Sequence, residues 1–562
     1  MKTLEVREEP LPDRYRHLGG RSLTSRIILD EVPPNCDPLG RHNQLVFAAG
    51  LMAGTPLSSS GRISIGAKSP LTGGIKESNG GGTTAQRLAR SGYRALIIEG
   101  KPEPGRLFLL FIGAGRAELR PAEDLQGLGT YRLAEVLRER FGPRAGLALI
   151  GPAGEMQLSS ALVAHTDADG VPSRVCGRGG LGAVMGSKGL KAVVIDDSGT
   201  SSVEIHDPER FREINRELTK ALVENPQTKV FEVYGTAAMV DTTNALGALP
   251  TRNFSSGSFE GAEKINGDAL HQTILKRGGE GRPSHACMPG CAIRCSNVFP
   301  DPSGKAIVAP LEYETIGLMG SNLGIDDLDS IARLNWLCND IGIDTIEAGA
   351  TLAVAMEAGL ARFGDARGAE RLVREIAGGT VLGRVLGEGA AVAGRVLGVR
   401  RVPVVKGQSF AAYDPRSVKG LGVTYATSPM GADHTAGQTI RTPIDHHRSE
   451  KQVETSRNAQ LGVLMFDLLG VCILAGPGIG PRRDLVRDLV ASRFGWNLEA
   501  GFFDRIAWET IRAERKFNRL AGLTEASERL PEFILEEALP PHSTVFDLNA
   551  KDLEEVFPEG DQ

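Results

Sequence analysis

The chain has 562 residues, of which 41% are hydrophobic, so it is long enough for about two to four domains with ordinary cores. Its 64 Lys and Arg residues are interspersed with 69 Asp and Glu residues, and the net charge of −5 argues against a nucleic-acid partner. Residues 1–16 carry charges and prolines where a signal peptide needs an apolar run, and no uncharged apolar stretch approaches the ~20 residues that span a bilayer. We therefore expect a cytoplasmic globular protein with no nucleic acid bound and no membrane span.

Residues 1–203 are predicted to form a β-rich domain. Short apolar segments between clusters of Gly, Pro, Asp and Ser predict strands at residues 44–49, 94–98, 107–112, 147–150 and 192–195. Two glycine-dense loops, 60–84 and 173–188, lie among them and contain arginines and an asparagine. Bare amides and guanidinium groups suit phosphate and heteroaromatic edges, so these loops predict a ligand site. The alternative is that they are only tight turns.

The second loop contains Gly177-Arg-Gly-Gly-Leu-Gly182, which matches the dinucleotide-binding pattern G-x-G-x-x-G. A Rossmann turn needs a strand just before it and a full crossover helix after it. Here polar residues precede the pattern, and only about nine residues separate it from the next predicted strand, so the match is weak. Neither loop contains the P-loop pattern G-x4-G-K-[ST].

The hydrophobic period changes at Asp207, where helices begin. Phe211, Ile214, Leu218 and Leu222 follow at helical spacing, and Asp207 is placed to cap the helix at its N-terminus. Further helices are predicted at residues 327–339, 345–359, 360–398, 452–475 and 483–523.

The C-terminal third is predicted to begin with a loop-rich stretch at residues 404–447. The tail after Leu530 is acidic and predicted to be a surface arm. The predicted fold is therefore α+β, with a β-rich domain followed by two mainly α-helical domains at residues 204–403 and 404–562.

Three of the seven cysteines lie within nine residues, in Cys287-Met-Pro-Gly-Cys291-Ala-Ile-Arg-Cys295. Soft thiolates at such spacing suit an iron–sulfur cluster that takes a fourth cysteine from elsewhere. A zinc site is a weaker alternative, because only His285 lies close by. A radical-SAM triplet runs C-x3-C-x2-C, which differs from this spacing by one residue.

The candidate fourth ligand is Cys472, at the end of Asp467-Leu-Leu-Gly470-Val-Cys472. A similar segment, Asn339-Asp-Ile-Gly342-Ile-Asp344, follows another predicted helix. A carboxylate one turn before a helix-terminating glycine is aimed at whatever lies beyond the helix end. Cys338 and Cys176 are expected to be core residues without a ligand role.

Together these motifs resemble the tungsten-containing aldehyde:ferredoxin oxidoreductase family over nearly the whole chain. The segments that carry the resemblance are Asp30-Glu-Val-Pro-Pro, Asp37-Pro-Leu-Gly, Gly61-Arg62, Lys68-Ser-Pro-Leu-Thr-Gly-Gly, Gly177 to Lys188, the cysteine triplet, Glu312-Tyr-Glu314-Thr and the segment from Asp467 to Cys472.

The resemblance implies a tungsten or molybdenum ion held by two molybdopterins at the domain interface, Mg²⁺ bridging their phosphates, and a [4Fe–4S] cluster. The cluster ligands it implies are Cys287, Cys291, Cys295 and Cys472, although the first cysteine gap here is three residues where the best-known members have two. The pterin and phosphate contacts it implies are Arg62, Asn79, Gly81, Arg174, Gly177, Arg178, Asn339, Asp344 and Asp467. Asn339 stands where the family pattern has an aspartate, so that contact is expected to be weaker.

The activity implied is oxidation of an aldehyde to a carboxylic acid, with electrons leaving through the cluster to ferredoxin. Such chemistry needs an acid/base beside the metal. The family uses a Glu and a His, for which Glu314 is the first choice, Glu312 the second, and His434 the histidine. His446 and His447 are the runners-up for the histidine. Pocket walls are expected from residues 404–447 and 311–325.

Two other functions stay open at this point. One is a reductive enzyme of the same family, similar to the tungsten subunit that dearomatises benzoyl-CoA. The other is an iron–sulfur electron-transfer protein with degenerate pterin loops, against which Arg62, Asn79 and Asp467 speak. Members of the family open with a strand that this chain does not show, so an exposed sheet edge is expected. We therefore expect association with itself or with a small ferredoxin-like subunit.

Overall fold

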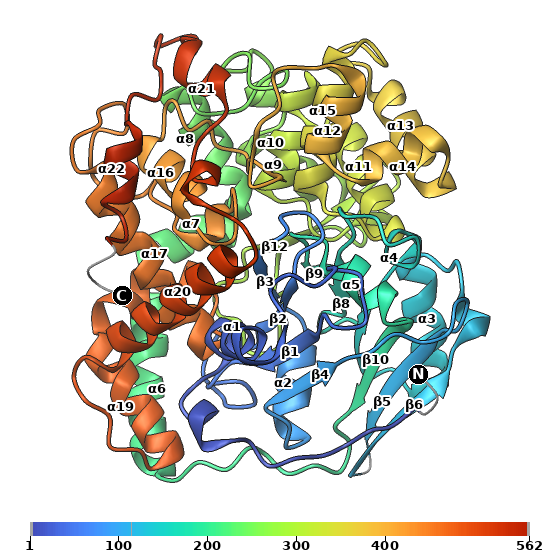
Figure 1. Cartoon of the computed structure of the whole chain (residues 1–562), viewed down its shortest axis with the longest axis vertical. Coiled ribbons are helices and arrows are strands. Elements are labelled where there is room, and N and C mark those ends of the chain that lie inside the picture. The colour runs from blue at the N-terminus through green and yellow to red at the C-terminus, as the bar shows by residue number, and fades with distance from the viewer. Residues whose placement is uncertain (1–3, 114, 559–562) are drawn as a thin grey trace.

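The computed structural model describes residues 4–113 and 115–558, and its β-rich N-terminal part contains two sheets (Figure 1). The first sheet has the order β3-β2-β1-β4 and is antiparallel, with strands β1 Leu45–Ala49, β2 Ile63–Lys68, β3 Ile75–Gly80 and β4 Ala95–Ile98. The second has the order β6-β5-β10-β7-β8-β9, with strands β5 Phe108–Gly113, β6 Arg116–Pro121, β7 Gly146–Leu149, β8 Val163–His165, β9 Arg174–Cys176 and β10 Leu190–Asp196. Each of the five predicted strands is present, shifted by at most two residues at either end.

Helices also cover the sheets, and sequence periodicity did not predict them. They are α1 Gly20–Glu31, α2 Thr84–Arg90, α3 Thr130–Phe141, α4 Pro152–Glu155 and α5 Leu181–Ser187. In α1 the buried face includes Arg21, Ser22, Thr24 and Ser25 beside its leucine and isoleucines. Because polar and apolar residues are buried together, the helix has no clear apolar stripe.

The two sheets approach each other where β3 contacts β9. A Cβ on Gly80 would lie 2.9 Å from the carbonyl oxygen of Val175, closer than real side chains approach. The glycine at the end of β3 therefore lets the backbones of the two glycine-dense loops meet.

The helical part begins after an extended segment, 197–207, that follows β10. Its first section contains α6 Pro208–Val223, α7 Pro226–Tyr234, α8 Met239–Leu246, α9 Gly267–Arg277, β11 Arg282–His285, β12 Ser296–Pro300, β13 Ala306–Val308, α10 Tyr313–Met319, α11 Leu328–Ile341, α12 Thr345–Glu357, α13 Ala366–Gly378, α14 Val381–Gly387 and α15 Ala390–Leu397. Asp207 caps α6 as expected, because its side chain accepts a hydrogen bond from the backbone N–H of Arg210.

The last section contains β14 Val404–Val405, β15 Gln408–Ser409, α16 Lys419–Thr427, α17 Gln452–Leu469, α18 Gly476–Ile479, α19 Arg483–Phe494, α20 Phe502–Leu520, α21 Glu532–Glu536 and α22 Ala550–Glu554. The stretch 404–447 was expected to be loop, but it holds the nine-residue helix α16. Every residue of α16 is buried, so it shows no polar face, and its two glycines weaken the helical signal. The limits proposed for the three domains stay predictions.

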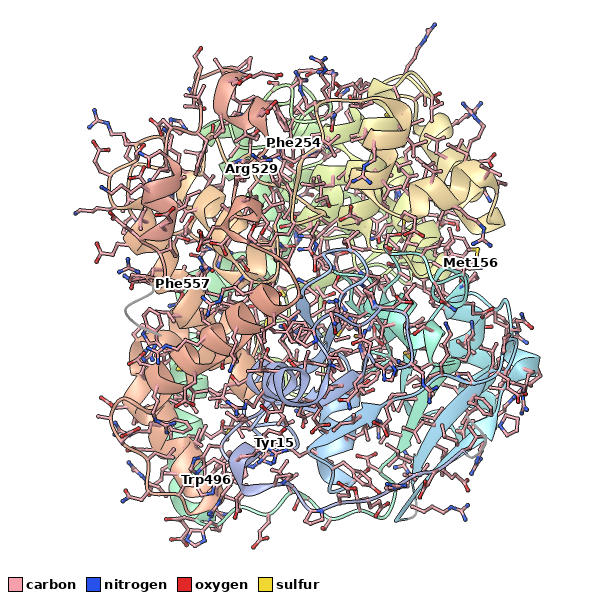
Figure 2. All side chains as sticks on the ribbon, viewed as in Figure 1. Tyr15, Met156, Phe254, Trp496, Arg529 and Phe557 are labelled. Atoms are coloured by element: carbon pink, nitrogen blue, oxygen red, sulfur yellow. The ribbon has the colours of Figure 1, made fainter. Side chains whose placement is uncertain are left out.

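The prediction that the tail is a surface arm is wrong. Leu530, Phe533, Ile534 and Phe557 are buried in the largest hydrophobic core. Phe557, labelled in Figure 2, meets the ring of Trp508 edge-on, with ring centres 5.9 Å apart. Acidic residues lie between these buried apolar residues in the sequence, so the tail shows no regular apolar pattern.

The three parts meet in the middle of the molecule, with the β-rich part (blue to cyan) below, α9 to α15 of the first helical section above and the last section (orange to red) beside both (Figure 1). The first helix of that section, α6, lies lower down beside α19. Within residues 4–113 and 115–558, no single helix is long and apolar enough to cross a membrane. Only α17 taken with the segment Ile473–Phe494, at a bend of 110°, passes by length and composition.

Candidate cofactor and active site

The cysteine triplet forms the loop between two paired strands, β11 and β12, whose ends meet where His285 faces Ser296. Cys287, Cys291 and Cys295 are buried and belong to the same apolar cluster as residues of α6, α17 and α19. A hydrogen bond between the first two thiols lowers the pKa of Cys291 and raises that of Cys287. The loop therefore places three sulfur atoms together in apolar surroundings.

Cys472 comes to the triplet from the end of α17. That helix ends at Gly470, whose φ of +69° is the left-handed conformation expected for this turn. The backbone N–H of Cys472 donates to the carbonyl of Ser59 at 2.9 Å, and the hydroxyl of Ser59 lies 3.6 Å from the sulfur of Cys291. Burial and then the charge of Cys472 raise the pKa of Cys295, so this distant cysteine is electrostatically close to the triplet.

The donor set fits an iron–sulfur cluster, because four buried cysteines meet at this corner. Among the described residues, no group of three or more His, Cys, Asp or Glu is arranged to hold a single metal ion. That arrangement speaks against the zinc alternative, in which four ligands converge on one atom.

Gly81 lets the first glycine-dense loop approach the triplet. A Cβ at this position would lie 3.3 Å from the sulfur of Cys287 and 3.2 Å from Met288. The neighbouring amide of Gly61 donates to the sulfur of Met288 at 3.2 Å. Larger residues at position 81 would press on the cysteine corner.

Arg62, Asn79 and Asp467 form a hydrogen-bonded chain beside the cysteines. Arg62 donates to both the side-chain and the main-chain oxygen of Asn79, the latter at 2.8 Å. Asn79 donates in turn to Asp467 at 3.3 Å. Burial would lower the pKa of Arg62, but Cys472 and Cys287 raise it, so the guanidinium stays charged next to the sulfur atoms.

Behind Asp467 lies a buried pair that the sequence did not predict. Arg21 of α1 contacts Asp467 at 3.4 Å and forms two hydrogen bonds of 2.9 Å with Glu514 of α20. The side chains of Arg21 and Glu514 are almost fully buried, at 3% and 0% exposure. The only local signal is the pair of glycines before Arg21. A Cβ on Gly20 would lie 1.9 Å from the carbonyl oxygen of Asp467.

Arg174 connects the second glycine-dense loop with the strand and helix that follow the triplet. It donates to Glu312 at 3.2 Å and to Ser296 at 3.3 Å. Burial would lower the pKa of Arg174, but Glu312 and Cys287 raise it. Glu312 is the N-cap residue of α10, but its side chain makes no capping hydrogen bond. The side chain is 35% exposed and forms the ion pair with Arg174.

Arg178 joins all three parts of the molecule. Its Nε lies 3.5 Å from Asp344, the residue that caps α12, and its Nη1 donates to the carbonyl of Ala432 at 2.7 Å. Glu347, which sequence analysis missed, lies 3.9 Å away and accepts hydrogen bonds from Ser409. A Cβ on Gly177 would lie 3.2 Å from Asp344, so this glycine permits the close contact.

Glu314 and His434 meet across the two helical sections. The carboxylate Oε1 of Glu314 lies 3.2 Å from Nε2 of His434, and Oε2 accepts a hydrogen bond from the amide of Ala412 at 2.7 Å. Each side chain is 18% exposed, and the ring of Tyr413 lies 5.9 Å from that of His434. Glu314 is thus held at one oxygen and faces a histidine with the other.

Family models describe both halves of this architecture. The model of the aldehyde ferredoxin oxidoreductase N-terminal domain matches residues 1–197, and that of domains 2 and 3 matches residues 213–559. The chain belongs to the aldehyde ferredoxin oxidoreductase family.

Relatives in this family span nearly the whole chain. The tungsten-containing aldehyde ferredoxin oxidoreductase of Pyrococcus abyssi is 34% identical over 95% of this chain and 90% of its own length. A more distant relative is the WOR-like subunit of the aliphatic sulfonate oxidoreductase of Pyrococcus furiosus, 27% identical over 78% of this chain and 73% of its own length. The active-site complex BamBC of benzoyl coenzyme A reductase shares the fold, with a TM-score of 0.79 at 22% identity over 97% of this chain and 90% of that one.

Within this aldehyde ferredoxin oxidoreductase fold, three other predicted residues make contacts with groups other than Glu314. The carbonyl of Asn339 accepts a hydrogen bond from Thr130 of α3, so its contacts turn toward the β-rich part. His447 contacts the carbonyl of Leu246 at 2.9 Å. Burial lowers the pKa of His446.

Several buried polar atoms around the aldehyde ferredoxin oxidoreductase site have no hydrogen-bond partner among the described residues. They include Nε of Arg178, Nε2 of His165, Oη of Tyr425, Nδ1 of His434 and both amide atoms of Gln408. Burial lowers the pKa of His165 to about 3, so this imidazole is neutral. Buried polar groups are ordinarily paired, and unpaired donors and acceptors gathered at one junction fit a polar organic ligand such as a pterin.

Proposed function

We propose that this protein is a tungsten-dependent oxidoreductase that converts aldehydes to carboxylic acids and passes the electrons through a [4Fe–4S] cluster to ferredoxin. The observation that carries this proposal is the Glu314–His434 pair at 3.2 Å. Glu312, two residues before Glu314, acts electrostatically on Cys295 and Cys472 of the four-cysteine corner. Membership of the family and 34% identity to a tungsten-containing aldehyde enzyme support the same activity.

In the proposed reaction an aldehyde and water give a carboxylic acid, two protons and two electrons. A bound tungsten bis-molybdopterin, or less often its molybdenum counterpart, would supply a Lewis acid and a two-electron acceptor. Since ferredoxin accepts one electron at a time, a cluster held by Cys287, Cys291, Cys295 and Cys472 suits the exit route.

The residues proposed to hold the pterins are those gathered at the three-part junction. Arg62, Arg174 and Arg178 offer guanidinium groups for phosphate oxygens, and Asn79, Asp344 and Asp467 offer acceptors for pterin amines. Gly81 and Gly177 keep the approach open, and Asn339 would add a weaker contact. Mg²⁺ would complete the proposed cofactor set by offsetting the negative charge of the pterin phosphates.

Glu314 is the proposed proton acceptor. The amide of Ala412 stabilises its Oε2, so Oε1 remains to take the proton released when water adds to the aldehyde carbon. His434 lies next to that oxygen, with its Nε2 3.2 Å away, and can take the proton from it. Tyr413 and Tyr425 are buried beside the pair and exclude bulk water.

A reductive activity is the second candidate, because the benzoyl coenzyme A reductase complex shares this fold at a TM-score of 0.79. At 22% identity that likeness concerns the fold alone. The Glu–His pair serves proton transfer in either direction, so the substrate decides between the two.

The test is metal analysis of anaerobically purified protein, followed by viologen reduction with a panel of aliphatic and aromatic aldehydes. We expect tungsten or molybdenum, iron, and aldehyde-dependent reduction. Metal without aldehyde turnover would favour the reductive activity. Iron without tungsten or molybdenum would favour an electron-transfer protein.

The partners proposed are ferredoxin and either a second copy or a ferredoxin-like subunit, in the cytoplasm. The edge strand β4 supports association, because it presents Ile97 at 41% exposure. Light scattering tests this, and a monodisperse monomer near 59.8 kDa would contradict it.

A further inference from the structure

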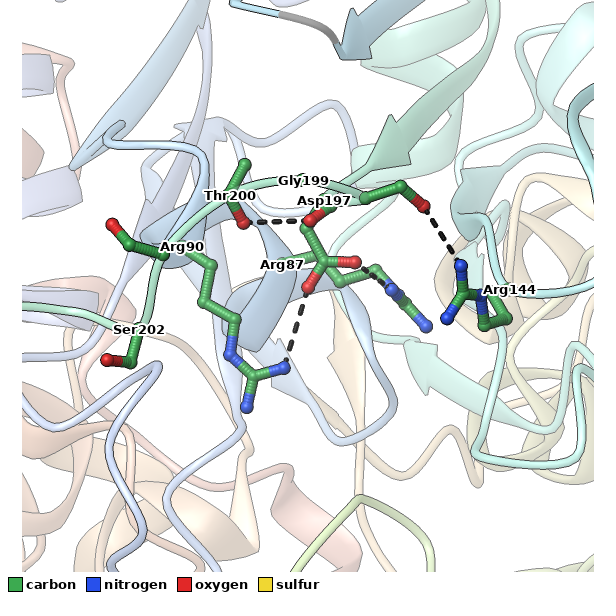
Figure 3. A pocket seen from close by; sticks show the side chains of 9 residues that line it. Arg87, Arg90, Arg144, Asp197, Gly199, Thr200 and Ser202 are labelled. Atoms are coloured by element: carbon green, nitrogen blue, oxygen red, sulfur yellow. Dashed lines mark hydrogen bonds and ion pairs between the residues drawn. The ribbon is translucent and has the colours of Figure 1, made fainter.

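A cavity with a volume of about 470 Å³ opens at the far end of α2 from the cofactor junction (Figure 3). Its walls are Arg87 and Arg90 of α2, Arg144 before β7, and the segment 197–202 that leads from β10 toward α6. Neither the iron–sulfur corner nor the Glu314–His434 pair takes part in it.

The walls of this cavity carry more positive than negative charge. Asp197 is the only acidic residue that lines it, and it pairs with Arg87 and, at 3.5 Å, with Arg90. Arg144 has a long contact of 3.5 Å with the hydroxyl of Ser198. Figure 3 shows the three guanidinium groups arranged around the 197–200 turn. Asp196, next to the lining, also interacts electrostatically with Arg87 and Arg144. Two carboxylates thus face three cations, which leaves one positive charge in excess.

The position of Arg87 is fixed by packing. A Cβ on Gly146 would lie 2.4 Å from Cδ of Arg87, so only glycine leaves room for the arginine stem. Nε of Arg87 is buried and has no hydrogen-bond partner among the described residues. Arg90 is more exposed than Arg87, with side-chain exposures of 42% and 19%.

The remaining lining is small and polar. It consists of Ser198, Gly199, Thr200, Ser201 and Ser202. The hydroxyl of Thr200 donates to the carbonyl of Asp197 at 2.8 Å, which closes the turn on which the cavity rests. No aromatic side chain lines the cavity, so it offers no face on which a nucleobase could stack.

We propose that this cavity binds a small anion carrying two linked phosphate groups, of the diphosphate class. Guanidinium groups fork onto phosphate oxygens, and three of them can engage more than one phosphate at once. The volume falls within the range of small-molecule sites, which is more than a single phosphate needs. A lining of charged and small residues without any aromatic side chain favours a compact phosphate ligand over a nucleotide.

The site has a physical connection to the cofactor junction. α2 begins at Thr84, three residues after Gly81, and ends at Arg90, which is a span of roughly 10 Å at the rise of an α-helix. A ligand that binds Arg87 and Arg90 would also bind the 197–202 segment, and so would tie α2 to the chain that leads into α6.

Calorimetric titration with inorganic pyrophosphate at constant ionic strength tests the proposal, with orthophosphate and sulfate as smaller anions. Constant ionic strength matters because exposed charges are screened by salt. We expect pyrophosphate to bind more tightly than either smaller anion, and we expect its addition to raise the unfolding temperature.

Three variants make the test specific. The double variant Arg90→Gln/Arg144→Gln removes the two exposed cations and should weaken binding about tenfold or more. Arg140→Gln is the matched control, because Arg140 is a similarly exposed arginine that pairs with Asp124 outside the cavity. Asp197→Asn keeps an acceptor for Arg87 and removes the competing charge, so pyrophosphate should bind more tightly.

Two results would overturn the proposal. One is pyrophosphate binding no tighter than sulfate, which would indicate general ionic attraction. The other is unchanged affinity in the Arg90→Gln/Arg144→Gln protein. Neither result depends on tungsten or on aldehyde turnover, so the redox proposal stands or falls separately.

Discussion

The cysteine corner and the Glu314–His434 corner are assembled in different ways. Three of the four cysteines lie in one nine-residue loop between paired strands, whereas Glu314 and His434 come from separate helical sections. The first corner buries sulfur atoms among apolar side chains, and the second holds a carboxylate between an amide and an imidazole. The contrast separates the proposed metal site, most of which local spacing supplies, from the proposed proton-transfer pair, which only the tertiary fold brings together.

Cys472→Ser should have the largest effect, because Cys472 is the one proposed cluster ligand that lies outside the nine-residue loop. We expect loss of iron and of visible absorbance, and aldehyde-dependent viologen reduction at background. Iron analysis of anaerobically purified protein measures the first. Cys36→Ser is the control, since Cys36 is partly exposed and lies outside the triplet. A serine variant with full iron content would show that Cys472 is not a ligand.

Glu314→Gln tests the other corner. If Oε1 accepts the proton, turnover should fall about 100-fold to 10,000-fold with tungsten and iron content unchanged. Glu312→Gln is the matched control two residues away, because Glu312 pairs with Arg174 instead of His434. We expect less than about a tenfold loss from it. Equal losses in the two variants would contradict the assignment of Glu314.

Features that depend on local sequence could be predicted, as the comparison of the two corners also indicates. The triplet, the D-x-x-G helix end at Asp467 and the glycine loops are local patterns, and the structure places them at one junction. Strands bounded by turn residues were also predictable. The helix α1 was not, because its buried face mixes Arg21 and serines with apolar residues.

Long-range partners explain the rest. Arg21 and Glu514 are 493 positions apart, so no periodicity connects them. Glu347 looks like an ordinary helical glutamate until the fold places it beside Arg178 and Ser409. The tail failed as a surface arm because its apolar anchors are separated by acidic residues and find their partners in distant helices.

Glu514→Ala should have the next largest effect, on stability. Removing this carboxylate leaves Arg21 buried at 3% exposure with only the 3.4 Å contact to Asp467. Breaking a buried ion pair on one side costs about 3–5 kcal/mol. Urea unfolding measures the loss. Glu509→Ala on the same helix is the control, because its pair with Arg505 is exposed and should contribute less than about 1 kcal/mol. Similar losses in both would contradict a special role for the Arg21 pair.

The smallest expected effect concerns Glu77, a buried carboxyl group of β3 behind the Asp467 chain. Burial, together with the charge of Asp467, raises the pKa of Glu77 from 4.5 to about 8. Burial also raises that of Asp467 from 3.8 to about 6. Each carboxyl group therefore has a higher pKa in the folded state than in the unfolded state. At a pH between its two pKa values the folded state binds more protons, so the free energy of unfolding decreases as the pH rises.

Glu77→Gln should remove the contribution of Glu77 to the pH dependence of the unfolding free energy. We expect this most clearly between pH 6 and 8, where Asp467 has largely titrated. One carboxyl group contributes at most about 1.4 kcal/mol per pH unit. Urea midpoints of apoprotein measured across this range should therefore fall less steeply in the variant than in the natural protein. Glu135→Gln, on the exposed face of α3, should leave the slope unchanged. Parallel curves for the natural protein and Glu77→Gln would mean that Glu77 is already ionised in the folded state, and that Arg21 offsets its burial more fully than the geometry indicates.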